Sequence, residues 1–235
     1  MQADPVILQE WVPPLESGDR LTRHEFERRY RAMPQVKKAE LVEGVVYVAS
    51  PVRMMRHARP HGRVITWLGT YEAATPGVMV GDNPTVRLDL DNEPQPDALL
   101  RIEEACGGRS RITADDYVEG APELIVEVAA SSASYDLHDK LTAYRRNGVE
   151  EYLVWLVMEG EFRWYELREG AYYLQSAITG EAVYKSRVMP GLWLDTNALL
   201  AGEMAQVLAV LQQGIDSQEH QDFVRRLRNL AEGTA

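Results

Sequence analysis

The alternation of apolar and polar positions along the 235 residues predicts a mixture of helices and strands. Apolar side chains recur every three or four residues where a helix buries one face, and several segments show this spacing. Thr22 followed by Glu25 has the spacing of a capping box, which favours a helix start at that point. The predicted helices span residues 21–33, 64–74, 134–147 and 197–229, the last with a break near Gly214.

Runs rich in β-branched and aromatic residues predict the strands. Residues 39–50 are typical of a hairpin that turns at Glu43-Gly44, and a second hairpin is expected around Glu169-Gly170. Further strands are expected at residues 78–80, 85–90, 97–102, 123–129 and 151–157.

The order of these elements predicts the fold class. A strand at 123–129, a helix at 134–147 and a strand at 151–157 form a crossover unit, which indicates an α/β (α+β) fold. We expect a mixed central β-sheet flanked by helices within a single domain, residues 1–196. Residues 197–235 would form a C-terminal helical extension packed on that domain or on a partner.

Composition places the chain among soluble proteins. The single cysteine, Cys106, cannot form an intramolecular disulfide, which fits a reducing compartment. Residues 1–10 show no signal-peptide pattern, and no apolar run approaches the roughly 20 residues that span a bilayer. We therefore expect a cytoplasmic protein without a membrane segment.

Net charge weighs against a simple nucleic-acid binder. The chain has 36 acidic and 25 basic residues, giving a formal charge of −11, and such an excess repels phosphate. Metal-dependent nucleases are a partial exception, because the metal ion neutralises their carboxylates.

Two carboxylates and one lysine are the strongest candidates for chemistry. Asp97 follows Pro96 at the start of a predicted strand, and Glu127 lies inside the apolar run 124–128. A buried, unpaired carboxylate costs several kcal/mol, so Glu127 requires a lysine, a donor network or a metal. Lys140 lies on the next predicted helix, with Asp136 and Tyr144 one turn away on either side. Each residue alone also has a structural explanation, such as a turn cap or a surface ion pair.

The segment from Pro122 to Trp155, PELIVEVAASSASYDLHDKLTAYRRNGVEEYLVW, resembles the signature of a large family of bacterial restriction-endonuclease-like proteins. That family belongs to the PD-(D/E)XK nuclease superfamily. The matching positions are Pro96-Asp97, Glu127-Val128, Ser131-Ser132, Asp136, Lys140, Tyr144 and Gly148-Val149. Glu40–Gly44 resembles the family's acidic entry motif, His61 its next-helix histidine, and the likeness extends to residues 189–192, covering roughly residues 20 to 200.

One position departs from the superfamily pattern. The standard motif has a lysine two residues after the second acid, where this chain has Ala129. Members of the resembled family supply the lysine from the neighbouring helix, and Lys140 is the matching residue.

The resemblance implies a restriction-endonuclease-like core and a metal-dependent endonuclease acting on DNA. Asp97 and Glu127 would hold Mg²⁺, with Mn²⁺ as a substitute, and Lys140 would position the attacking water. Glu40 or Glu43 would complete the acidic cluster, with Glu40 preferred because Glu43 lies at a turn. His61, Asp136 and Tyr144 are accessory candidates, and a homodimer would supply two sites for cutting both strands.

An arginine-rich segment is a candidate phosphate contact. Residues 53–63 contain Arg53, Arg56, Arg59 and Arg63 beside two histidines, although a solvated loop explains the same pattern. Two alternatives to the nuclease remain at this stage. One is a catalytically silent module of the same fold that binds nucleic acid or protein, and the other is a metal-dependent hydrolase of another substrate.

Overall fold

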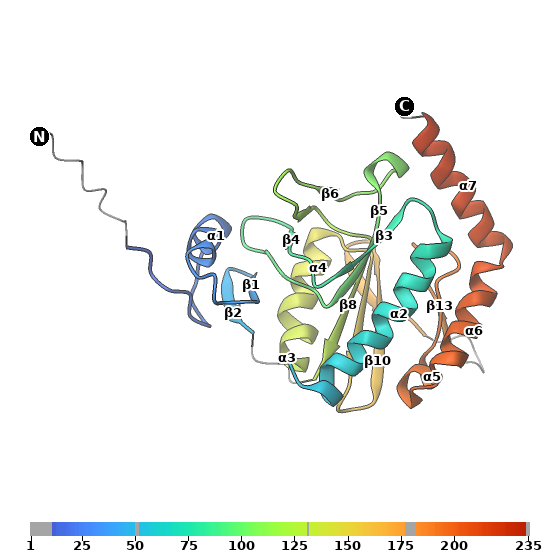
Figure 1. The fold of residues 1–235 in the computed structure, drawn as a ribbon, viewed down its shortest axis with the longest axis horizontal. Coiled ribbons are helices and arrows are strands. Elements are labelled where there is room, and N and C mark those ends of the chain that lie inside the picture. Colours follow the sequence, from blue (N-terminus) through green and yellow to red (C-terminus); the bar gives the residue numbers. More distant parts are fainter. Residues whose placement is uncertain (1–10, 50–51, 131, 177–181, 234–235) are drawn as a thin grey trace, which may run out of the picture.

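The protein is described by a computed structural model that covers residues 11–49, 52–130, 132–176 and 182–233 (Figure 1). Residues 1–10, for which the sequence predicts no signal peptide, lie outside the described residues. A six-stranded mixed sheet forms the centre, in the strand order β11-β10-β9-β8-β5-β3. The predicted α/β class with a mixed sheet flanked by helices is confirmed.

Only one pair of neighbours in this sheet is parallel. β8 (Leu124–Ala129) and β9 (Glu151–Leu156) run in the same direction, joined by the crossover helices that the sequence predicts. The other neighbours pair antiparallel, and the strands are β3 (Val78–Asp82), β5 (Ala98–Ile102), β10 (Glu161–Arg168) and β11 (Ala171–Leu174).

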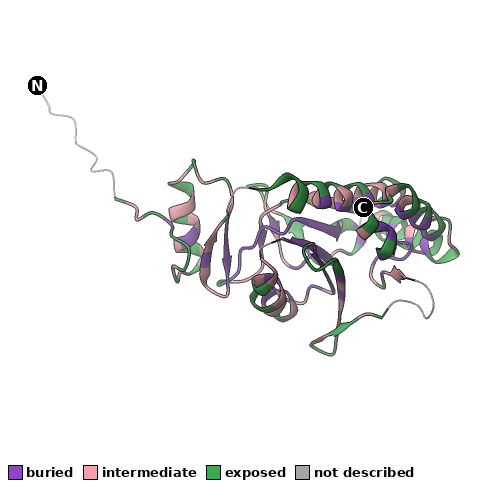
Figure 2. Ribbon diagram, turned by 90° about the horizontal axis from the view of Figure 1, so that it is seen from below, coloured by how far each residue is buried: buried purple, intermediate pink, exposed green. Residues whose placement is uncertain are grey.

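Helices cover both faces of the sheet, and the strands most completely buried are β5, β8 and β9 (Figure 2). Trp67 on α2 (Arg59–Ala74) packs in one core with Val126 and Val128 of β8. On the opposite face, Tyr144 of α4 (Leu141–Asn147) packs with Ile125. Because side chains alternate along a strand, Glu127 faces the same side as Ile125, toward α4.

The C-terminal helices contribute to the first of these cores. They are α5 (Thr196–Ala201), α6 (Met204–Ile215) and α7 (Gln218–Gly233), and the predicted break near Gly214 is the junction of α6 and α7. Leu211 of α6 and Phe223 of α7 belong to the same buried cluster as Trp67. Among the described helices, none has the length and apolar character to cross a membrane.

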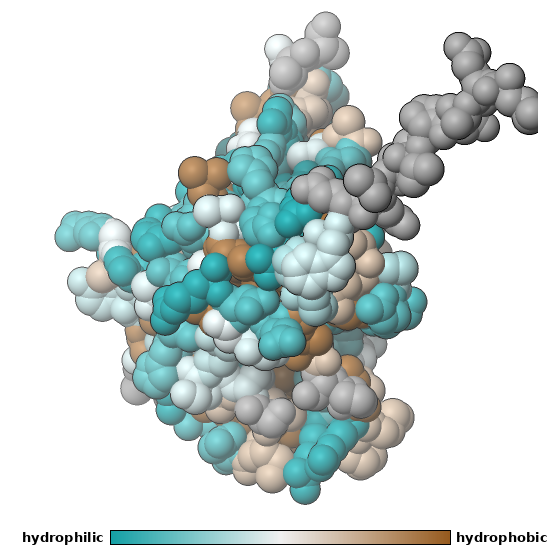
Figure 3. Space-filling model, turned by 90° about the vertical axis from the view of Figure 1, so that its left-hand side faces the viewer, coloured by the Kyte–Doolittle hydropathy of each residue, from teal (hydrophilic) through white to brown (hydrophobic). Residues whose placement is uncertain are grey.

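The N-terminal segment forms a smaller unit beside the sheet. α1 (Arg23–Arg31) packs on the hairpin of β1 (Ala39–Val42) and β2 (Val45–Val48) around Phe26 and Leu41. The hairpin turns at Glu43 and Gly44, as predicted, with φ values of 51° and 73°. The side of the molecule that carries these elements is mostly hydrophilic, with apolar residues scattered across it (Figure 3).

Two local predictions were wrong. Thr22 is the N-cap residue of α1, but the hydrogen bonds of a capping box are not formed. The Thr22 side chain makes no capping hydrogen bond, and Glu25 accepts from Arg28 and Arg29 at 2.7 Å each. Of the expected strand 85–90, only β4 (Val86–Arg87) forms, in a small sheet with β6 (Arg111–Ile112) and β7 (Val118–Glu119). Thr85 and Leu88 lie outside any ladder, because this small sheet offers β4 only a two-residue partner.

The arginine-rich segment is helical rather than a loop. A π-helical turn, η1 (Met54–Ala58), leads directly into α2, which begins five residues before the predicted start. Pro60 lies in the first turn of α2, directly after this π-helical turn. The remaining elements are the short helices η2 (Glu104–Cys106), α3 (Ala133–Tyr135) and η3 (Asp136–Lys140), and the strand pair β12 (Val183–Lys185) and β13 (Trp193–Asp195).

Candidate active site

Asp97 and Glu127 face each other across two adjacent strands. Ala98 pairs with Val126, and the same antiparallel register places Asp97, the residue just before β5, opposite Glu127. Directly opposed residues of an antiparallel pair point to the same face of the sheet, roughly 5 Å apart at their Cβ atoms. The backbone N–H of Val128 donates to Asp97 Oδ2 at 2.8 Å, which fixes this carboxylate beside β8.

Lys140 reaches the two strands from η3. Its Nζ lies 2.8 Å from Glu127 Oε1, 2.9 Å from Glu40 Oε1 and 3.8 Å from Asp136 Oδ1. The side chain of Lys140 is only 3% exposed, so these ion pairs are formed away from water. The predicted residues Glu127, Lys140 and Asp136 therefore converge in one buried cluster.

Two further predicted residues lie in this cluster, and one does not. The hydroxyl of Tyr144 donates to Glu127 Oε1 at 2.9 Å. Glu40, on β1, also accepts from the backbone N–H of Gln95 at 2.7 Å, which ties the hairpin to the sheet. Glu43 instead lies at the hairpin turn and pairs with Arg146 at 3.0 Å. The preference for Glu40 over Glu43 agrees with these positions.

Asp97 has three cationic or polar neighbours. His61 was predicted as an accessory residue, whereas Lys38 and His57 were not predicted as site residues. Lys38 Nζ lies 3.4 Å from Asp97 Oδ1, and His57 Nε2 donates to Oδ2 at 3.1 Å. His61, an accessory candidate, lies next to the same residue, since its Nε2 is 2.9 Å from the main-chain oxygen of Asp97. Lys38 and His57 come from distant segments, so only the folded chain brings them to Asp97.

Tyr135 is a further residue of the cluster that sequence analysis missed. Its ring lies 5.3 Å from Lys140 Nζ and 4.0 Å from the ring of Tyr47. Its hydroxyl oxygen is buried and has no hydrogen-bond partner among the described residues. The position directly before Asp136 was the only available sequence signal.

The cluster holds more negative charge than its lysine can balance. Burial raises the pKa of Glu127 to about 8, with Lys140 opposing this shift and the charges of Asp97, Asp136 and Glu40 adding to it. Burial also raises the pKa of Asp136, to about 6. Burial alone would lower the pKa of Lys140, but the surrounding carboxylates hold it well above its usual value.

Asp97 behaves differently from Glu127. Burial would raise its pKa, but the hydrogen bond from His57 and the charges of Lys38, His57 and Lys140 hold the pKa below its ordinary range. One carboxylate of the facing pair is thus firmly ionised, and the other is held close to protonation. An additional cation between them would relieve this imbalance.

The chemistry of the donor set fits a hard divalent cation. Carboxylate and carbonyl oxygens are the ligands that Mg²⁺ takes in proteins, and Asp97, Glu127 and the Val128 carbonyl are the candidates on these strands. Among the described residues, no three acidic, histidine or cysteine side chains are already arranged around a common metal position. Lys140, Lys38 and His57 instead contact the carboxylates, so metal binding would require these side chains to give way.

The four candidate phosphate contacts separate into two groups. Arg53, Arg56 and Arg59 are exposed on η1 and at the start of α2. Arg63 turns away toward α5, where Nη1 donates to the Leu199 carbonyl at 3.4 Å and the guanidinium packs over Gly202. Arg63 does not extend the exposed group, because its guanidinium is held against the Leu199 carbonyl and Gly202.

The sequence of the chain matches the model of the Uma2 family, described as "Putative restriction endonuclease", over residues 23–197. The chain belongs to the Uma2 family. That match includes Glu40, Asp97, Glu127 and Lys140, and it ends where the C-terminal helices begin.

A solved structure has a similar fold. It is a crystal structure from Anabaena variabilis described as "a putative nuclease belonging to DUF820", with a TM-score of 0.53 and 10% sequence identity. The alignment covers 78% of this chain and 97% of that one. At this identity the likeness supports the restriction-endonuclease-like fold of this Uma2 protein. A comparison with curated protein sequences finds no match to the chain.

Proposed function

We propose that this Uma2 protein is an endonuclease that hydrolyses phosphodiester bonds in DNA with a divalent metal, Mg²⁺ or Mn²⁺. The observation that carries the proposal is the pairing of Asp97 and Glu127 on facing strands, with Lys140 Nζ 2.8 Å from Glu127 inside a buried acidic cluster. Family membership and the described nuclease neighbour support the same reaction class.

In this proposal Asp97 and Glu127 are the metal ligands. When bound, Mg²⁺ would supply Lewis-acid stabilisation of the charge that develops on the phosphate oxygens. The ionised Asp97, held by Val128 N–H at 2.8 Å, is the fixed ligand. Glu127 becomes a full ligand when Lys140 gives up its direct contact.

Lys140 would orient the attacking water. Its ammonium lies within hydrogen-bond distance of both Glu127 and Glu40, so a small shift would let it donate to a water between them. The Tyr144 hydroxyl donates to the same oxygen, Glu127 Oε1, and restricts how far that carboxylate can move. Glu40 and Asp136 keep Lys140 protonated, which suits a residue that orients water rather than one that removes its proton.

Cleavage of supercoiled plasmid and of circular single-stranded DNA in Mg²⁺, Mn²⁺ or EDTA tests the proposal. We expect nicking or linearisation with metal, none in EDTA, and loss in both Glu127→Gln and Lys140→Met. Glu123→Gln is the matched control, because Glu123 is a buried acid just before the same strand, β8, but contacts Ile102 and Arg109.

The cleavage assay, together with measured binding of metal and of DNA, separates the alternatives. Cutting that survives Glu127→Gln would point to a contaminating nuclease and contradict the site. Metal binding without cutting of any DNA would favour a hydrolase of another substrate. Binding of DNA without metal binding or cutting would favour a catalytically silent module.

A further inference from the structure

A strongly basic and apolar surface segment borders the acidic cluster. We call residues 52–59, which join the N-terminal hairpin to α2, the Met-Arg turn. Three of its apolar side chains are exposed to an unusual degree: Val52 at 64%, Met54 at 67% and Met55 at 63%. Arg53, Arg56 and Arg59 are exposed in the same segment, and the chain has no acidic residue from Val52 until Glu72.

The Met-Arg turn touches the candidate active site directly. His57, in the same π-helical turn as Met54 and Met55, donates to Asp97 Oδ2 at 3.1 Å. Side chains on the outer side of this turn therefore lie next to any substrate bound at Asp97. Both π-helical turns of the described chain, η1 and η3, lie at this site, and such turns are frequent at functional sites.

We propose that the Met-Arg turn binds nucleic acid whose bases are unpaired, with the arginines on the phosphates and Val52, Met54 and Met55 against the base faces. This inference rests on the proposed nuclease function and adds its substrate class. The ligand is a stretch of unpaired nucleotides next to the cleaved bond, such as a single strand, a frayed end or a flap.

Charge complementarity selects a polyanion as the ligand. The molecule carries a net charge of −11, yet this turn is uniformly basic, so a phosphate backbone is attracted here while most of the surface repels it. An acidic protein surface would share the charge but would not need the candidate active site beside it.

The exposed apolar side chains select unpaired bases over an intact duplex. A duplex presents sugar and phosphate on its outside, so Met54 and Met55 would gain no apolar contact from it. Flexible thioether side chains adapt to flat apolar surfaces, and proteins insert such side chains between unstacked bases. Base faces become available only where the strands are separate or the stack is broken.

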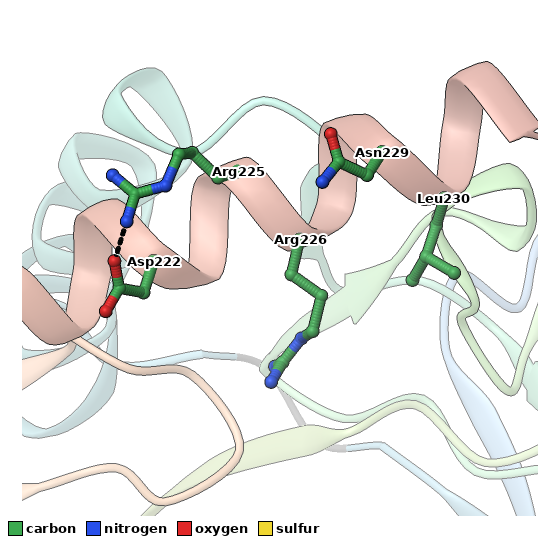
Figure 4. Close-up of a pocket in the computed structure, with 5 residues that line it drawn as sticks. All are labelled: Asp222, Arg225, Arg226, Asn229 and Leu230. Carbon is green, nitrogen blue, oxygen red and sulfur yellow. Dashed lines mark hydrogen bonds and ion pairs between the residues drawn. The ribbon is translucent and has the colours of Figure 1, made fainter.

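A second basic surface provides a matched control. Arg225 and Arg226 of α7 line a shallow hollow together with Asp222, Asn229 and Leu230 (Figure 4). Arg228 is exposed on the same helix. Arg225 is paired with Asp222, and Arg226 lies 5.1 Å from the Phe223 ring. This surface mixes acids with its arginines and lies on the far flank of the sheet from α3 (Figure 1).

Fluorescence anisotropy with labelled single-stranded and duplex DNA of the same sequence tests the inference. The measurements are made in EDTA, so neither metal nor cleavage is needed. We expect wild type to bind the single strand more tightly than the duplex. Met54→Ser with Met55→Ser should weaken single-strand binding about tenfold while leaving duplex binding unchanged.

The arginine variants separate phosphate contacts from base contacts. Arg53→Gln with Arg56→Gln should weaken binding to both DNAs and reduce the salt slope on the single strand by about 1.4, since each contact contributes about 0.7. Arg225→Gln with Arg228→Gln on α7 should change neither. An equal loss of DNA affinity in the α7 variant would mean that DNA is attracted non-specifically to any basic surface of the protein, and it would overturn the inference.

Three other results would also overturn it. These are a preference for duplex, an unchanged single-strand affinity in the methionine variant, or a dimer in sedimentation that the methionine variant dissociates. The last would make the turn a contact between two copies of the chain. Failure of the nuclease proposal gives a different result, because binding could follow the expected pattern in EDTA while no metal supports cutting.

Discussion

Lys140 determines the charge balance of the buried cluster. Its ammonium is the cation shared by Glu40, Glu127 and Asp136, all of which are less than about a tenth exposed. Removing one partner of a buried ion pair leaves charge uncompensated, which costs far more than losing a surface pair. The same residue thus holds the folded cluster together and is the one that we propose to orient the attacking water.

Lys140→Met should lower the free energy of unfolding by about 3–5 kcal/mol, because three carboxylates lose their shared cation. Urea unfolding of wild type and variant measures this loss, with Lys37→Met on the exposed surface as the control. Millimolar Mn²⁺ should stabilise the variant more than wild type, since the cation would bind in place of the ammonium. A variant as stable as wild type without metal would contradict the charge balance described above.

The residues that could be predicted from sequence are those within a recognisable local pattern. Asp97 lies just before β5, Glu127 lies on β8 and Lys140 on the helical turn that follows, and the resemblance to the restriction-endonuclease-like family predicted that the three act together. Lys38 and His57 meet Asp97 from 59 and 40 residues away, and no local pattern encodes such contacts. Folding of the hairpin and of η1 against the sheet is what places them there.

At the scale of elements, a buried ionic group joins the N-terminal unit to the small sheet. Arg87 on β4 lies 3.2 Å from Glu27 of α1, 3.8 Å from Glu93 and 3.0 Å from Asp115. Burial and the neighbouring Glu27 raise the pKa of Glu93 to about 8, against the lowering effect of Arg87 and Arg23. Glu93 is therefore a buried carboxyl group with a raised pKa at the junction between the two units.

This junction predicts a pH dependence of stability. The folded pKa of Glu93 lies above its unfolded value near 4.5, so its stabilising contribution is complete below that value and is lost as pH rises through about 8. Glu93→Gln should remove this loss. Relative to wild type, the variant should gain about 4 kcal/mol of unfolding free energy between pH 5 and pH 9. Urea unfolding at both pH values tests it, with exposed Glu159→Gln as control, and parallel curves would contradict the raised pKa of Glu93.

Element boundaries show where sequence patterns lose information. The helices and hairpins were predictable because their apolar spacing is regular, and Gly148, with φ of 81°, ends α4 as expected. The start of α2 was not predictable, because Arg53–Pro60 lacks an apolar stripe. The helical structure there is held in place by contacts of His57 and His61 with Asp97. Tertiary contacts set that boundary.

Across the whole molecule, the C-terminal helices pack into the core beside the sheet. α6 passes so close to residues 189–193 that a Cβ on Gly214 would collide with the Gly191 carbonyl and lie 2.8 Å from the Trp193 ring. The sequence left open whether residues 197–235 pack on their own domain or on a partner. Leu211 and Phe223 are buried against the same core as Trp67, which favours packing on the chain's own sheet.

Gly214→Ala should destabilise the whole fold by about 1–3 kcal/mol, because the added methyl group forces α6 away from the core. Gly69→Ala is the control, since nothing lies within 4 Å of a Cβ at this position in the middle of α2. That control should gain about 0.5–1 kcal/mol from better helix propensity. Thermal unfolding distinguishes them, and an unchanged Gly214→Ala would mean that α6 is not integral to the fold.

The proposed nuclease function requires above all that Asp97 and Glu127 together bind a divalent cation. Titration with Mn²⁺, with free ion counted by its electron paramagnetic resonance signal, measures this without any assumption about the substrate. We predict one Mn²⁺ per chain for wild type and for Glu123→Gln, and none for Asp97→Asn or Glu127→Gln. Equal binding by all four proteins, or no binding by wild type, would contradict the claim.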